Sequence, residues 1–86
     1  MTDYERAELE VCIDVLNSLV AEFYNITSRH NISLDADTNT GAYYRKMLKY
    51  VQHLRKATSY DEVLTARSNI ATIREKLVKL EVNNYV

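Results

Sequence analysis

The chain has 86 residues, which is enough for one domain with a single hydrophobic core. Its hydrophobic fraction of 47% argues against disorder, and its net charge of −1 points to no strongly charged partner. One glycine and no proline exclude a turn-rich fold and a glycine-rich phosphate-binding loop, because both need those residues at several positions. We therefore expect long helices with few turns between them.

The first helix is predicted over residues 3–30. Thr2 and Glu5 have the spacing of a capping box, in which each side chain binds a free backbone N–H at the start of a helix. Further apolar residues, Val11 and Val20 among them, widen the main stripe, so this helix should pack against more than one neighbour. The main stripe follows the three- and four-residue spacing of one helix face and consists of Leu9, Cys12, Leu16, Leu19, Phe23 and Ile26.

Residues 31–41 interrupt this pattern with polar side chains that compete for backbone hydrogen bonds and with the only glycine, Gly41. A second helix is predicted to begin between Thr38 and Ala42 and to cover about residues 41–57. The connection to the third helix is so short that the two helices must run antiparallel. The apolar stripe of the second helix, with Leu48 beside it, is Tyr44, Met47, Val51 and Leu54.

The third helix is predicted over residues 60–82 and is followed by a short tail at residues 83–86. Ser59 and Glu62 repeat the spacing of a capping box at its start. Its apolar seam is narrow and unbroken, which is typical of helices packed lengthwise. The seam consists of Val63, Ala66, Ile70, Ile73, Leu77 and Leu80.

Together these elements predict an all-α fold, an antiparallel three-helix bundle that forms a single domain over residues 1–86. A long helical hairpin that completes its core by dimerising is the alternative. The wide stripe of the first helix and the regular seam of the third helix both favour assembly with a second copy.

Charge is divided unevenly along the chain. Residues 1–37 hold eight acidic and two basic residues, which gives −6, whereas residues 38–59 hold five basic residues and no acid, which gives +5. The basic face of the second helix combines cations with tyrosine rings, the residue types that bind acidic proteins or nucleic acids. A solvated helix face would also explain them. The predicted partner-binding residues are Tyr43, Arg45, Lys46, Lys49, Tyr50, His53 and Lys56.

Residues 35–39 resemble the opening of an EF-hand calcium loop, which needs oxygen ligands at alternate positions. The pattern then departs from that loop. Thr40 occupies the sixth position, where glycine is needed, and Lys46 occupies the twelfth, where a glutamate binds the ion. A polar turn that caps the second helix explains these residues without a metal, so we expect no metal site and no cofactor.

Residues 53–59 partly resemble the phosphoacceptor strip of histidine phosphotransfer domains. In that family a helical histidine is followed by a lysine three places on, then by a small residue and a serine, as in His53, Lys56 and Ser59 here. The resemblance implies a histidine that carries phosphate. However, Ala57 stands where that family has glycine, and its bundle has one helix more. A solvated histidine near a helix end is the preferred interpretation.

Catalysis finds little support in the residues. Cys12 falls in the apolar stripe of the first helix, where burial raises the pKa of a thiol and makes it a poor nucleophile. A single cysteine allows no internal disulfide, and the sequence contains neither a signal-peptide pattern nor an apolar run of about 20 residues. We therefore expect a cytoplasmic protein that is not an enzyme.

For function, we expect a small protein-interaction module that occupies a surface of another protein, as an inhibitor, a regulator, an immunity protein or an adaptor does. Its general character also fits a viral accessory protein encoded by a phage. A homo-oligomer is compatible with the fold, and no membrane contact is expected. The alternative is binding of nucleic acid or a nucleotide through the basic face of the second helix, for which affinity would fall steeply with salt.

Overall fold

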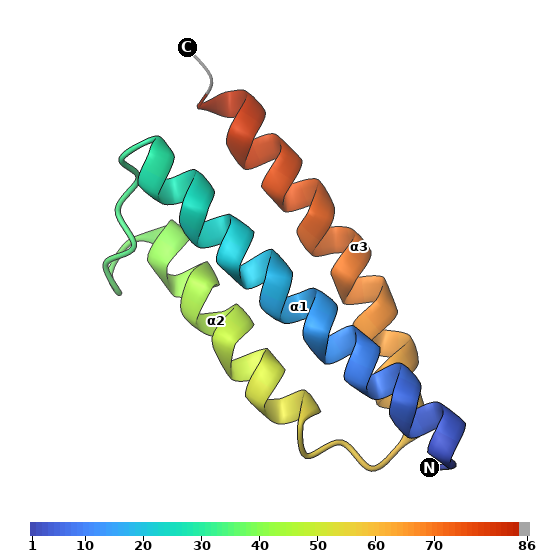
Figure 1. Cartoon of the computed structure of the whole chain (residues 1–86). Coiled ribbons are helices and arrows are strands. Elements are labelled where there is room, and N and C mark those ends of the chain that lie inside the picture. Colours follow the sequence, from blue (N-terminus) through green and yellow to red (C-terminus); the bar gives the residue numbers. More distant parts are fainter. Residues whose placement is uncertain (85–86) are drawn as a thin grey trace.

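Three helices make up the part of the chain that the computed structural model describes, residues 1–84 (Figure 1). α1 spans Asp3–Arg29, α2 spans Asn39–Leu54 and α3 spans Tyr60–Asn83. α1 and α3 run in the same direction, and α2 runs antiparallel to both (Figure 1). The predicted three-helix bundle is confirmed. α2 begins within the predicted range of Thr38 to Ala42, although it ends three residues earlier than predicted.

α1 makes most of the contacts between helices, because it packs against both α2 and α3 (Figure 1). The prediction that the first helix touches both others is confirmed. α2 and α3, by contrast, approach each other closely at only a few backbone positions. The bundle is therefore elongated and flattened, with principal extents of 47, 23 and 15 Å. Side chains, rather than close backbone contact, line the space between α2 and α3.

The hydrophobic core forms where the apolar stripes of the three helices meet. Phe23, Leu54 and Val63 are fully buried in it. Leu48 and Val11, which the sequence places beside the stripes, are exposed. Three predicted stripe residues are only partly buried: Leu19, Tyr44 and Leu80. The core consists of Leu9, Cys12, Leu16, Val20, Phe23, Ile26, Met47, Val51, Leu54, Ala57, Val63, Ala66, Ile70, Ile73 and Leu77.

The predicted capping box of α1 is confirmed, because Thr2 and Glu5 exchange side-chain to backbone hydrogen bonds. The capping box predicted for α3 is wrong. The Ser59 hydroxyl accepts the backbone N–H of Asp61, but the carboxylate of Glu62 does not return to the start of the helix. It lies 2.8 Å from His53 instead, because the last turn of α2 brings that imidazole within its reach.

The boundaries of α2 follow from two local interactions. Thr38 starts the helix, because its hydroxyl accepts the backbone N–H of Gly41 at 2.9 Å. At the other end, the backbone N–H of Ala57 binds the carbonyl of Leu54, three residues back, at 3.0 Å. This tighter turn ends the regular helix and brings the Ala57 side chain into the core.

α3 continues one residue further than predicted, to Asn83, so the expected tail begins inside the helix. The amide of Asn84 caps this end by donating a hydrogen bond to the carbonyl of Leu80 at 2.8 Å. Residues 85 and 86 of the expected tail lie outside the described residues. Within residues 1–84, none of the helices has the length and apolar character needed to cross a bilayer.

Candidate functional site

A groove of about 550 Å³ runs between α2 and α3, and we call it the α2–α3 groove. It exists because both helices pack on α1 rather than closely on each other. Buried Met47 and Ile73 supply its apolar floor. Aromatic and polar side chains of α2 and polar side chains of α3 form its walls. The lining residues are Tyr43, Lys46, Met47, Lys49, Tyr50 and His53 from α2, and Asn69, Thr72 and Ile73 from α3.

Five of the seven predicted partner-binding residues line this groove. They recur at three- and four-residue intervals along α2, so one face of the helix presents them together. The other wall comes from α3, where Asn69 and Thr72 were not identified from the sequence. Their spacing from Ile73 puts them on the same side of α3, but only the packing of α3 against α2 reveals that this side matters. The five residues are Tyr43, Lys46, Lys49, Tyr50 and His53.

The other two predicted residues lie elsewhere. The guanidinium of Arg45 donates hydrogen bonds to the carbonyl of Leu34 at 2.6 Å and to that of Gly41 at 3.1 Å. Arg45 therefore holds the loop before α2 against the first turn of that helix. Lys56 lies beyond the end of α2 and does not line the groove.

The electrostatics of the α2–α3 groove favour an anion. Lys46 and Lys49 line it, and no acidic side chain does. Among residues 1–84, neither lysine has a carboxylate within 4 Å. A third ammonium, that of Lys76, lies 5.3 Å from the ring centroid of Tyr43. At the end of the groove, the carboxylate of Glu62 lies 2.8 Å from the imidazole of His53.

Two tyrosines shape the aromatic wall of the groove. Tyr43 packs against Phe23 with a centroid distance of 5.5 Å, and burial raises the pKa of Tyr43. Tyr50 stacks on His53 at 6.4 Å. The hydroxyl of Tyr50 is buried and has no hydrogen-bond partner among the described residues. Leaving such a group unpaired costs about 1–3 kcal/mol, so this hydroxyl lowers the stability of the fold beside the groove.

A polar cluster joins α1 to α3 near the start of both helices. The hydroxyl of Tyr60 donates to the carboxylate of Glu8 at 2.8 Å, and the guanidinium of Arg67 donates to the same oxygen. The hydrogen bond from Tyr60 lowers the pKa of Glu8, and the carboxylate in turn raises the pKa of Tyr60. The cluster could not be predicted, because its members are more than 50 residues apart in the chain.

The lowered pKa of Glu8 predicts a specific acid sensitivity. Because the folded pKa lies below the unfolded value near 4.5, the stabilisation is complete above that value. It is lost as the pH falls through the lower folded pKa. We expect the urea midpoint of the wild type to fall more steeply below pH 4.5 than that of Glu8→Gln. Glu10→Gln, at an exposed position on α1, is the matched control, and identical pH profiles for all three proteins would contradict the role of Glu8.

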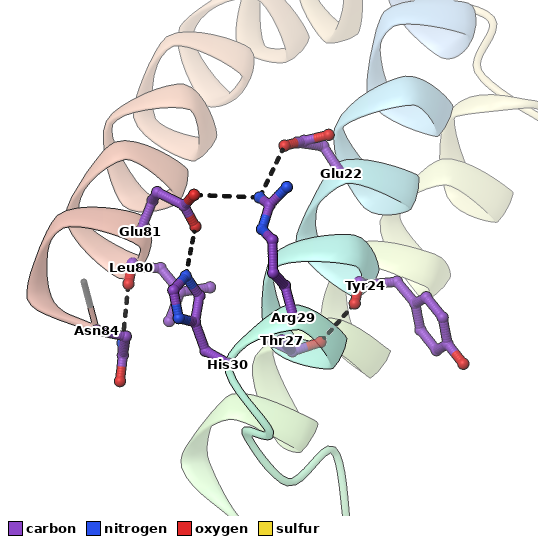
Figure 2. Close-up of polar contacts among 8 residues, drawn as sticks. All are labelled: Glu22, Tyr24, Thr27, Arg29, His30, Leu80, Glu81 and Asn84. Atoms are coloured by element: carbon purple, nitrogen blue, oxygen red, sulfur yellow. Dashed lines mark hydrogen bonds and ion pairs between the residues drawn. The ribbon is translucent and has the colours of Figure 1, made fainter. Parts of the chain in front are cut away.

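A second cluster joins the opposite ends of α1 and α3 (Figure 2). Glu81 lies 3.2 Å from Arg29 and 2.9 Å from His30, and Glu22 lies 3.8 Å from the same guanidinium. Figure 2 shows the Glu81 carboxylate reaching across from α3 to Arg29 at the end of α1 and to His30, which caps that helix. Exposed ion pairs contribute about 0–1 kcal/mol each. We therefore infer that this cluster helps to align the two helices and does not form a chemically reactive site.

The remaining motifs have structural roles in the described residues. The hydroxyl of Thr38 donates to the carbonyl of Asp35 at 2.7 Å, within the turn that caps α2. In residues 1–84, no three histidine, cysteine, aspartate or glutamate side chains lie close enough together to hold a metal ion. His53, whose sequence context resembles that of a phosphoacceptor histidine, has its Nε2 2.8 Å from the carboxylate of Glu62. Cys12 is buried, and burial raises the pKa of its thiol as predicted.

The chain matches no protein-family model, no curated protein and no solved structure.

Proposed function

We propose that this protein is a small, non-enzymatic interaction module whose α2–α3 groove binds an acidic, partly apolar segment of another protein. One observation carries the proposal. Side chains of α2 and α3 form a groove that combines an apolar floor with two lysines and no carboxylate. An isolated basic helix face in water would not have the apolar floor, and a closed core would not have the exposed lysines.

Different residues of the groove would make different contacts with a bound segment. Lys46 and Lys49 are one helical turn apart, so they can pair with carboxylates on neighbouring turns or residues of a bound segment. An apolar side chain between those carboxylates would cover Met47 and Ile73. Tyr50 lines the groove and adds contact area at little cost in side-chain entropy. The positive charge also accelerates encounter with an acidic partner.

Nucleic acid or a nucleotide is the alternative occupant of the same groove. Lysines beside tyrosine rings support it, because phosphates and bases use those groups. The number of cations argues for a protein partner. Two lysines line the groove, whereas nucleic-acid surfaces track the backbone with a long row of phosphate contacts.

Selection from a random peptide display library tests the proposal without a known partner. Peptides enriched on the wild type should carry aspartate or glutamate around a leucine, phenylalanine or similar side chain. Their binding should fall by about 10-fold or more in Lys46→Glu/Lys49→Glu, because two attractive charge pairs become repulsive.

The matched control is Arg55→Glu/Lys56→Glu, which reverses two charges of the same basic segment outside the groove. It should bind the selected peptides almost as well as the wild type does. Enrichment of peptides without acidic residues, or equal losses in the two variants, would contradict the proposal. Tighter binding of single-stranded oligothymidylate than of any selected peptide, with affinity falling steeply in salt, would support the nucleic-acid alternative.

A further inference from the structure

A second surface runs along α1 and α3, and no residue of α2 lines it. It contains two shallow hollows, of about 570 and 490 Å³, which share Arg74 and follow each other along the two parallel helices. We call this surface the α1–α3 face. Its exposed or half-buried apolar residues are Tyr4, Ala7, Val11, Val15, Val78 and Val82.

The apolar side chains of the α1–α3 face are unusually exposed. Tyr4, Val11, Val78 and Val82 have exposed fractions of 74, 61, 62 and 65%. A single exposed valine is ordinary on a protein surface, but a row of them along two adjacent helices marks an interaction surface. α1 and α3 lie side by side for about 35 Å, the length of a 24-residue helix, so the surface is long enough for a helical interface.

The charges of this face make it complementary to itself. Glu22 of α1 and Arg74 of α3 both line the second hollow, so the two opposite charges lie within the length of one hollow along the bundle. Arg74 has no carboxylate within 4 Å among residues 1–84. A two-fold axis parallel to the helices would preserve height and set α1 of one copy against α3 of the other. Each Glu22 would then face Arg74 of the second copy, and the pair would occur twice.

We infer that a second copy of the chain covers the α1–α3 face and forms a two-fold dimer with a four-helix interface. Such an interface is isologous, so it closes after two chains and does not continue into a filament. The α2–α3 groove lies outside the interface. The dimer would therefore present two grooves, and a partner with two acidic segments would bind with increased avidity.

Native mass measured by light scattering across the micromolar range tests this inference. The wild type should have twice the 10.0 kDa mass of the chain. Val11→Glu and Val78→Glu each place a carboxylate in the apolar interface and should weaken dimerisation by about 30-fold or more. Both side chains are exposed in the single chain, so the helical circular dichroism should not change. Leu48→Glu, on an exposed position of α2 outside this face, is the matched control and should leave the dimer intact.

Charge reversal then tests the geometry of the pairing. Arg74→Glu and Glu22→Arg should each weaken the dimer, and the double variant should recover the wild-type affinity. A wild-type mass of 10.0 kDa throughout the range would overturn the inference. A dimer that Leu48→Glu breaks and Val78→Glu leaves intact would overturn it as well. A monomeric wild type would leave the proposed peptide binding untouched, because Lys46 and Lys49 lie outside the α1–α3 face.

Discussion

Phe23→Ala should lower the free energy of unfolding by about 3–5 kcal/mol, the usual cost of removing a buried phenylalanine. Phe23 has no exposed surface and lies where α1 meets α2. Its ring packs against Tyr43 at 5.5 Å and against Tyr44 at 6.1 Å. A domain of this size has a total stability on the order of 4–13 kcal/mol, so this substitution should remove a large part of it.

Urea denaturation followed by circular dichroism measures this loss. Tyr24→Ala is the matched control, because Tyr24 is the next residue, also contacts Tyr44, at 6.3 Å, and is 53% exposed. Tyr24→Ala should lower the free energy of unfolding by no more than about 1 kcal/mol. If Phe23→Ala and Tyr24→Ala cost the same, the core would not be organised around Phe23.

Gly41→Ala should destabilise the protein by about 1–3 kcal/mol, the usual cost of overpacking, although alanine is the better helix former by about 1 kcal/mol. The reason is a close approach of the backbone. A Cβ atom at Gly41 would lie 2.0 Å from the carbonyl oxygen of Asp35 and 2.5 Å from that of Leu34. Backbone atoms cannot move aside as a flexible side chain can. The loop would have to shift, and the hydrogen bond from Arg45 to Leu34 would shift with it.

Whether Gly41→Ala lowers or raises stability decides which effect is larger, the close approach of the loop backbone or the better helix propensity of alanine. Thermal unfolding of Gly41→Ala should show a lower midpoint than that of the wild type. Asn39→Ala changes an exposed residue in the same first turn of α2 and should leave the midpoint almost unchanged. A raised midpoint for Gly41→Ala would show that helix propensity dominates and that the loop yields easily.

The helices could be predicted from the sequence because helical periodicity is a local property. Three- and four-residue spacing places residues on one face whatever the neighbours are. It does not say how far each stripe extends around the helix. Val11 and Val20 both widen the stripe of α1, yet Val20 is 7% exposed and Val11 is 61% exposed. Only the positions of α2 and α3 around α1 decide which side is covered.

The features that the sequence could not predict depend on contacts between distant residues. The α2 helix ends early because Ala57 turns into the core, and Glu62 leaves the expected capping box because His53 lies nearby. The basic face of α2 was predicted as one surface. Arg45 is separated from it because its guanidinium binds the loop at Leu34, a partner 11 residues away in the chain.

The central claim, that the α2–α3 groove binds acidic segments, is tested most directly by mapping amide chemical shifts of isotope-labelled protein. The probe is a short peptide with a leucine–phenylalanine pair flanked by glutamates, and its lysine-flanked counterpart is the control. We predict saturable shifts confined to residues 43–53 of α2 and 69–76 of α3 with the acidic peptide, and none with the basic one. Equal shifts with both peptides, or shifts from the acidic peptide that map to the α1–α3 face, would contradict the claim.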